Sequence, residues 1–142
     1  VGINSRLDSL NAFVLNEKLK IFHKISKTRN DFYKYYVDNL SDCDFIKLPK
    51  KENSNILLNY FTISINKNLR DKLMDYLKIN GITTSIYYKT PVHQLPALSF
   101  MNKSFKLDKT VNASKTVLSL PLYPFAKKSE MERVVKKILN FS

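Results

Sequence analysis

Gly2-Ile3-Asn4-Ser5-Arg6-Leu7-Asp8-Ser9-Leu10-Asn11-Ala12 leads into a long run of sequence that contains no Gly or Pro before Pro49. From Leu7 onward, apolar residues recur at intervals of three and four residues or multiples of these, which predicts an amphipathic helix. Leu7, Leu10 and Val14 are therefore expected to turn inward. The polar ends of Asn4 and Arg6, in the short extended lead-in, are expected to point out of the chain.

Three segments of the sequence carry a resemblance that spans most of the chain. They are Gly2-x-Asn4-x-Arg6-Leu7-Asp8-x-Leu10-x-Ala12 with Lys18-Leu19, then Gly81-Ile82-x-Thr84-x-Ile86-Tyr87-Tyr88-x-x-Pro91-x-His93, then Val117-Leu118-Ser119-Leu120-Pro121-Leu122-Tyr123-Pro124. In this order they resemble the C-terminal part of the DegT/DnrJ/StrS sugar aminotransferases, which are pyridoxal-phosphate enzymes of fold type I. The resemblance implies a linker helix followed by the small C-terminal domain of such an enzyme.

The first part of the chain predicts one long helix, or two in line, that extends to Leu40. Arg29-Asn30-Asp31 interrupts its apolar stripe and is interpreted as a bend. The polar stretch 42–55, which contains Pro49, predicts a surface loop. Residues 60–65 then alternate between apolar and polar side chains, which predicts a half-buried strand with Phe61, Ile63 and Ile65 on one face.

The second half predicts two further strands and three helices. A helix over 69–79 would be capped by Asn68 and closed by Gly81, and strands are expected at 82–88 and 117–120. The strand-helix-strand unit over 60–88 implies a parallel pair, or a pair with another strand between, joined by a right-handed crossover. A helix is expected at 108–117, and Ser129-x-x-Glu132 predicts a capping box for a closing helix. Its expected inner face holds Met131, Val134, Val135 and Ile138.

These elements together predict the α/β fold class, with two or three strands covered by helices behind a long helix. Residues 1–41 are assigned to the lead-in and linker helix, and residues 42–142 to the small α/β domain. The sequence begins at Val1, and it is interpreted as a fragment or processed form of a larger protein.

Composition narrows the class of protein. With 142 residues, of which 44% are hydrophobic and 12% aromatic, the chain can bury one modest core. No apolar run approaches the roughly 20 residues that span a bilayer, and no leader is visible, so neither a membrane partner nor export is expected. Cys43 is the one cysteine and the histidines are His23 and His93, which favours a reducing cytoplasm and no metal site.

The net charge of +12 raises a nucleic-acid-binding module as an alternative. The lysines are spread along the chain and form no dense block, and no signature of a nucleic-acid-binding fold is present. A general enrichment in lysine explains much of the charge, so no nucleic-acid partner is expected.

The resemblance assigns roles to the opening residues. In the family, the asparagine at the position of Asn4 reaches across a dimer interface to the phosphate of the neighbouring subunit's cofactor, and an amide at a helix entrance suits an anion. The alternative is that Asn4 caps the helix. Arg6 has a planar fork of donors that would hold the substrate's diphosphate or a carboxylate, or it would form an ion pair with Asp8.

A second group of candidate site residues comprises Tyr87, Tyr88 and His93. Alternation along a strand would send Tyr87 and Tyr88 to opposite faces, so one is expected to face a cleft and the other to pack. His93, after Pro91 in an irregular loop, would donate to sugar hydroxyls or pyrophosphate, or would be an ordinary surface residue. The resemblance favours substrate binding for all three.

The function implied is transfer of an amino group, with glutamate as the expected donor, to a keto carbon of a nucleotide-linked sugar in glycan or lipopolysaccharide assembly. The cofactor, pyridoxal 5'-phosphate, would be bound mainly by a missing N-terminal domain of the homodimer. Its Schiff-base lysine lies upstream in the family, so no catalytic residue is assigned here and the chain alone is expected to be inactive. The alternative within the family is an incomplete or regulatory member that uses this domain for dimerisation.

Overall fold

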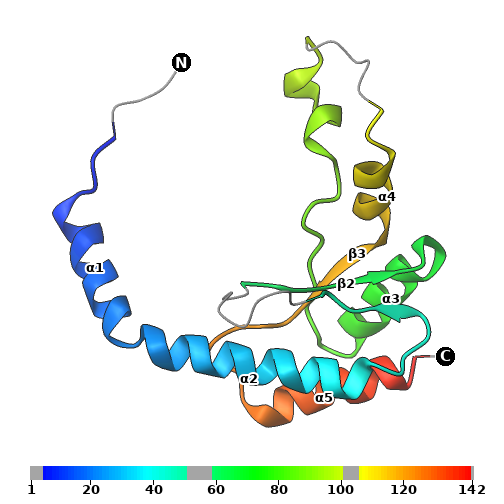
Figure 1. The fold of residues 1–142 in the computed structure, drawn as a ribbon, viewed down its shortest axis with the longest axis horizontal. Coiled ribbons are helices and arrows are strands. Elements are labelled where there is room, and N and C mark those ends of the chain that lie inside the picture. Colours follow the sequence, from blue (N-terminus) through cyan, green and yellow to red (C-terminus); the bar gives the residue numbers. More distant parts are fainter. Residues whose placement is uncertain (1–4, 51–58, 101–105, 142) are drawn as a thin grey trace.

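The structure, a computed structural model, describes residues 5–50, 59–100 and 106–141. It contains a three-stranded sheet surrounded by helices, with a helical arm at the start of the chain (Figure 1). In chain order the elements are α1 (Ser9–Lys20), α2 (Phe22–Leu40), β1 (Ile46–Lys47), β2 (Phe61–Ile65), α3 (Lys67–Ile79), the 3-10 turns η1 (Val92–Gln94) and η2 (Pro96–Leu98), α4 (Asp108–Thr116), β3 (Val117–Leu120) and α5 (Lys128–Leu139). The expected α/β class is confirmed.

The sheet has the order β1-β2-β3, and both pairs are antiparallel. Segments 60–65 and 82–88 run parallel with another strand between them, which is one of the two expected arrangements, because β2 and Ser85 both pair antiparallel with β3. Direct pairing of these two segments, the other expected arrangement, is wrong.

The predicted strand at 82–88 is reduced to one bridge. Ser85 exchanges both backbone hydrogen bonds with Ser119 on β3, with N···O distances of 3.1 and 2.7 Å. Ile82 is buried in the core, whereas Tyr87 already lies in a turn and contacts the ring of Tyr60. The segment thus leaves the edge of β3 after a single pair of residues.

The alternation predicted for β2 is confirmed. Phe61, Ile63 and Ile65 are buried, and the antiparallel register places Phe61 opposite Leu120 and Ile63 opposite Leu118 on the same face. On the other face the hydroxyls of Thr62 and Ser119 lie 2.8 Å apart in a hydrogen bond. One face of the sheet is therefore apolar and the other is polar.

Helices α2, α3 and α5 complete the core. The Tyr36 ring of α2 packs on Phe61 with centroids 4.8 Å apart, and Leu73 and Leu77 of α3 are fully buried. The predicted inner face of α5 is confirmed, because its apolar residues are all at most 4% exposed. These residues are Met131, Val134, Val135 and Ile138.

Helix ends follow local capping chemistry, with shifts from the predicted positions. The cap of α3 is Asn66, whose side-chain oxygen accepts from the Asn68 N–H at 3.0 Å, so Asn68 is not the cap. Gly81 has φ of 71°, which confirms its closing role. At α5 the Glu130 carboxylate accepts the Lys127 N–H at 2.6 Å, so Lys127 and Glu130 form the capping box. It lies two residues before the predicted pair, Ser129 and Glu132.

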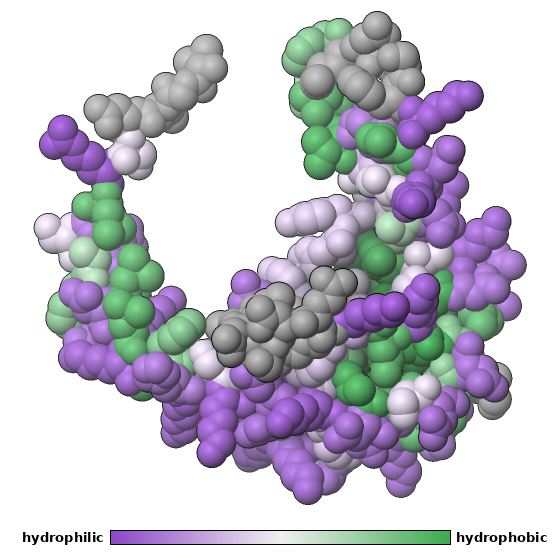
Figure 2. Space-filling view, in the orientation of Figure 1, coloured by the Kyte–Doolittle hydropathy of each residue, from purple (hydrophilic) through white to green (hydrophobic). Residues whose placement is uncertain are grey.

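The break in the long helix falls at Ile21 and not at Arg29-Asn30-Asp31, which remain helical. Asp8 caps α1, its carboxylate accepting from the Asn11 N–H at 2.8 Å. No residue of α1 is buried, and its apolar side chains lie along an arm that stands apart from the sheet (Figure 2). Leu7, Leu10 and Val14, expected to face inward, are 65%, 74% and 41% exposed, because the described residues pack nothing against this arm.

The helices within the described ranges include none that is both long enough and apolar enough to cross a membrane.

Candidate functional site

A hollow of about 240 Å³ lies where α2, the start of β2 and the exit of β3 meet. We call it the tyrosine cavity. Three tyrosines, an arginine and an amide supply most of its polar groups. Its lining residues are Arg29, Asn59, Tyr60, Thr83, Ser85, Tyr87, Ser119, Leu120, Pro121, Leu122, Tyr123 and Pro124.

Arg29 enters this cavity from the side of α2. Its Nη1 donates to Oδ1 of Asn59 at 2.8 Å, a contact between residues 30 apart in the sequence. Its Nε is buried and has no hydrogen-bond partner among the described residues. Arg29 therefore fixes one side of the cavity and keeps one donor unused.

The aromatic wall is formed by two tyrosines from different segments. The rings of Tyr60 and Tyr87 lie 4.3 Å apart between centroids, and the rings of Tyr87 and Tyr88 meet edge to face at 5.7 Å. The pKa of Tyr60 is raised, chiefly because the ionised form would lie beside Tyr87, while the charge of Arg29 acts in the opposite direction. Tyr60 thus remains a neutral hydroxyl at physiological pH.

The exit of β3 closes the cavity on the remaining side. The Tyr123 hydroxyl donates to Oε1 of Glu130 at 2.7 Å, which raises the pKa of Tyr123 and helps to lower that of Glu130. The pKa of Glu130 is lowered mainly by the backbone N–H of Lys127. Glu130 does not line the tyrosine cavity, so its charge is held on the α5 side.

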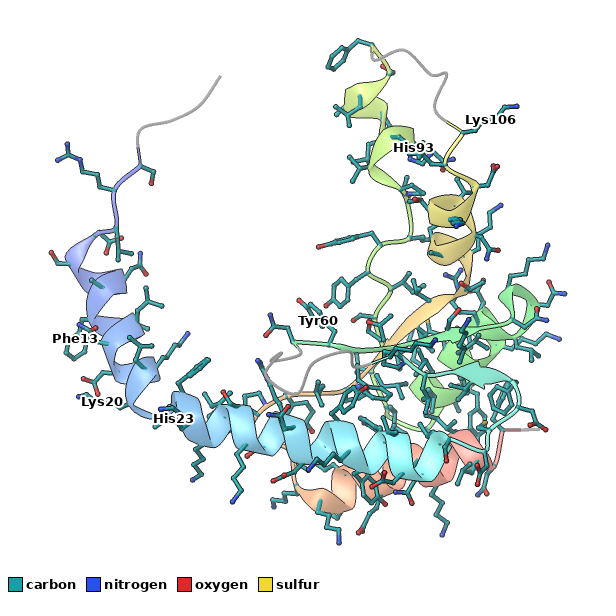
Figure 3. All side chains as sticks on the ribbon, in the orientation of Figure 1. Phe13, Lys20, His23, Tyr60, His93 and Lys106 are labelled. Atoms are coloured by element: carbon teal, nitrogen blue, oxygen red, sulfur yellow. The ribbon has the colours of Figure 1, made fainter. Side chains whose placement is uncertain are left out.

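The structure brings one of the sequence-predicted site residues into this cavity, namely Tyr87. Tyr88 is adjacent and 75% exposed, so the two rings lie in contact and not on opposite faces of a strand as predicted. His93 is half-buried in η1, on a projecting lobe well separated from Tyr60 (Figure 3).

The opening residues are placed differently. Arg6 is exposed in the lead-in to α1, and the ion pairs of the described residues do not include it. Asp8, its proposed alternative partner, is engaged by Asn11. Asn4 lies outside the described residues.

Sequence reasoning missed most of the cavity, including Arg29, Asn59 and Tyr60. The available signal was the arginine itself, a charged residue that interrupts the apolar stripe of a helix. It was interpreted as a bend, whereas the structure shows a side chain directed at the start of β2.

The chemistry of the lining fits an oxygen-rich ligand. A guanidinium, an amide and several hydroxyls bind phosphate, carboxylate or sugar oxygens, and aromatic faces pack against a ring. None of the described residues that line the cavity is a lysine, so this lining does not fit the aldehyde end of pyridoxal phosphate. Within the described ranges no group of three or more metal-binding side chains occurs.

Comparison with known proteins identifies the family. The model of the DegT/DnrJ/EryC1/StrS aminotransferase family matches residues 1–139. The chain belongs to this family, and it is composed of the C-terminal part of the fold type I aminotransferase architecture.

Two curated relatives and one solved structure show how similar this chain is to known proteins and how much of their length it covers. The chain is 32% identical to a pleiotropic regulatory protein of Geobacillus stearothermophilus and 30% identical to the dTDP-3-amino-3,6-dideoxy-alpha-D-galactopyranose transaminase of Aneurinibacillus thermoaerophilus. Each match covers 99% of this chain and 38% of the relative. A DegT/DnrJ/EryC1/StrS aminotransferase from Brucella abortus superposes with a TM-score of 0.88 at 29% identity, over 99% of this chain and 37% of that one. The chain thus spans well under half the length of the proteins that it matches.

Proposed function

We propose that this chain is the C-terminal portion of a pyridoxal-phosphate-dependent aminotransferase that transfers an amino group from glutamate to a keto carbon of a nucleotide-linked sugar. The observation that carries the proposal is the family match over residues 1–139, joined to a relative whose name specifies a dTDP-sugar transaminase. The tyrosine cavity adds a physical basis, because its donors and rings suit a sugar or an anionic group.

In this proposal the chain contributes substrate contacts. Tyr87 lines the cavity and would contact the ligand there. Tyr88, beside it, and His93, on the separate lobe, would contact other parts of the substrate. Arg6 would hold a diphosphate or carboxylate, and its exposure leaves the guanidinium free to reach a ligand. Asn4 would donate to the cofactor phosphate of the neighbouring subunit in a homodimer.

The cofactor would be held mainly by the part of the protein that precedes this chain in the relatives. When bound, pyridoxal phosphate supplies a Schiff base and an electron sink for transamination. None of the lysines that the structure describes lines the tyrosine cavity. Because the Schiff-base lysine of the family lies upstream of the segment that resembles residues 2–12, we propose that it lies outside residues 1–142 and that the chain alone has no turnover.

The proposal also covers the division of the chain into two parts and the cellular setting of the reaction. Residues 1–41 would serve as the lead-in and linker helix, and residues 42–142 as the small domain. The reaction would take place in the cytoplasm and supply glycan or lipopolysaccharide assembly. The lone Cys43, half-buried with its pKa raised by burial, agrees with a reducing compartment.

A second candidate function is regulation without turnover. It is favoured by the name of the 32% identical relative, a pleiotropic regulatory protein. In that case the domain would support dimerisation, and the protein would lack the lysine that the enzyme needs.

The test is reduction with borohydride in the presence of pyridoxal phosphate, followed by peptide mapping. The protein with its upstream part should give one pyridoxyl-lysine outside residues 1–142 and should aminate a nucleotide-linked keto sugar with glutamate. The isolated chain should give none at stoichiometric level. A trapped lysine within residues 1–142 would overturn the assignment, and trapping without any amination would favour the regulatory alternative.

A further inference from the structure

The strongest unassigned feature is the guanidinium of Arg29. We propose that the tyrosine cavity is an anion-binding site, in which Arg29 receives a phosphate or carboxylate group. Tyr87 lines this cavity and is also one of the proposed substrate-binding residues, so the anion site deepens the proposed function. Only the identity of the anion as part of the substrate rests on that function.

The first argument is the hydrogen bonding of Arg29. A guanidinium is charged at all physiological pH values and carries five N–H donors. Nη1 is used by Asn59 at 2.8 Å, while the buried Nε has no partner among the described residues. Arg29 therefore keeps donors that Asn59 does not use, and a buried donor without a partner costs free energy.

The second argument is charge. Among the residues that line the cavity, Arg29 is the one with a formal charge at neutral pH. The carboxylate of Glu130, which Tyr123 contacts, also binds the backbone of Lys127 and is not among the lining residues. Among the residues that the structure describes, the positive charge of Arg29 therefore has no carboxylate partner in the cavity lining, and the space is partly desolvated.

The third argument is the arrangement of the other donors. Asn59 fixes the guanidinium, and the next residue, Tyr60, stacks on Tyr87 at 4.3 Å. The hydroxyls of Tyr60 and Tyr87 belong to the same cavity as the arginine, whereas the Tyr123 hydroxyl donates its proton to Glu130. A planar fork with neighbouring hydroxyl donors is the arrangement that binds phosphate or carboxylate oxygens.

The test is a nuclear magnetic resonance titration of the ¹⁵N-labelled chain that follows the Nε–Hε signals of its arginines, which are Arg6, Arg29, Arg70 and Arg133. Inorganic phosphate is added in one series and acetate in another, both at ionic strength held constant with sodium chloride. The Arg29 signal should shift and saturate, whereas the signals of Arg70 and Arg133, held by the carbonyls of Ser114 and Asn80, should move little.

The two series distinguish the source of the anion. Saturation with phosphate alone indicates a phosphate-bearing ligand, and saturation with acetate alone indicates a carboxylate. Either result, or both together, supports the anion site. An Arg29 signal that responds to neither anion more than the Arg70 and Arg133 signals do would overturn it.

Arg29→Lys is the informative variant, because it keeps the charge and removes the planar fork. It should weaken anion binding by about tenfold or more. The matched control is Lys24→Gln, which removes an exposed charge one turn or more earlier on α2 and should leave affinity within about twofold. Equal binding by Arg29→Lys and the wild type would refute the role of the guanidinium.

The wild-type titration tests anion binding at Arg29 even if a variant does not fold. None of these measurements needs pyridoxal phosphate or turnover. If Arg29 binds the anion but the protein with its upstream part shows no aminotransferase activity, the proposed function is refuted and the anion site stands. If that protein is active but Arg29 binds no anion, the anion site is refuted and the proposed function stands.

Discussion

The hydroxyl of Tyr36 on α2 donates to the carbonyl oxygen of Pro121, 85 residues later, at 2.9 Å. The same oxygen lies 3.1 Å from the sulfur of Met131, but a hydroxyl has one proton and the carbonyl is the stronger acceptor. Tyr36 is fully buried. This bond joins the helix that carries Arg29 to the strand exit that closes the tyrosine cavity.

Removing that hydroxyl should destabilise the fold. Tyr36→Phe leaves the Pro121 carbonyl without its partner, and we expect a loss of about 0.5–1.5 kcal/mol in the free energy of unfolding, measured by urea denaturation. Tyr35→Phe, a half-buried neighbour on the same helix, is the control. An equal loss in both variants would mean that the Tyr36–Pro121 bond has no special contribution.

The apolar face of β2 should be sensitive to truncation. Ile63 is fully buried between Leu118 and the helices, so Ile63→Ala should cost about 2–5 kcal/mol by loss of burial and creation of a cavity. Ile79, at the end of α3, is 86% exposed, and Ile79→Ala should cost within about 0.5 kcal/mol. Chemical denaturation measures the free energy of unfolding of both variants. An equal loss for Ile63→Ala and Ile79→Ala would contradict the prediction.

Gly81 should resist replacement by alanine. Its φ of 71° is a left-handed conformation, and a Cβ there would lie 3.1 Å from Nη2 of Arg133. We expect Gly81→Ala to lower the melting temperature, with a cost of about 1 kcal/mol, and Gly81→Asn to cost less because asparagine tolerates this conformation. A melting temperature for the alanine variant that matches the wild type would contradict the strain argument.

The capping carboxylate of α5 should make stability depend on acidity. Hydrogen bonds from the Lys127 N–H and the Tyr123 hydroxyl lower the pKa of Glu130 from its ordinary value of 4.5. A lowered pKa in the folded state means that the stabilisation is present above pH 4.5 and is lost as the pH falls through the lowered folded value. Melting temperatures of the wild type and Glu130→Gln should therefore differ at pH 7 and converge in acid.

Glu132→Gln provides the charge-matched control for this effect. The Glu132 carboxylate makes a 3.8 Å ion pair with Lys128 in an exposed position, so its removal should change stability less at pH 7. If both variants gave the same dependence on pH, the charge of α5 and not the capping bonds would explain the result.

Several elements could be predicted from sequence because their signals are local. The alternation of Phe61, Ile63 and Ile65 defines a half-buried strand, and the spacing of Met131, Val134 and Ile138 defines the inner face of α5. Gly81 marks the end of α3 by its freedom to adopt positive φ. Such patterns depend on neighbours within a few residues, which the sequence displays directly.

What could not be predicted depends on contacts between distant segments. β1 has two residues, too few to show alternation, and forms because Ile46 pairs with Ile65 of β2. The antiparallel order follows from the path through α4, which no local pattern encodes. The tyrosine cavity likewise needs Arg29 beside Asn59 and Tyr60 beside Tyr87, pairs that only the folded chain brings together.

The single rung between Ser85 and Ser119 also bears on aggregation. Its two backbone bonds occupy the outer edge of β3 near its middle, while on the opposite side of the sheet β1 offers only two residues. Exposed strand edges are where foreign β-chains attach and where fibrils nucleate. Because the Ser85–Ser119 bridge occupies part of the β3 edge and β1 is only two residues long, the described strands offer a second chain few free backbone groups with which to extend the sheet.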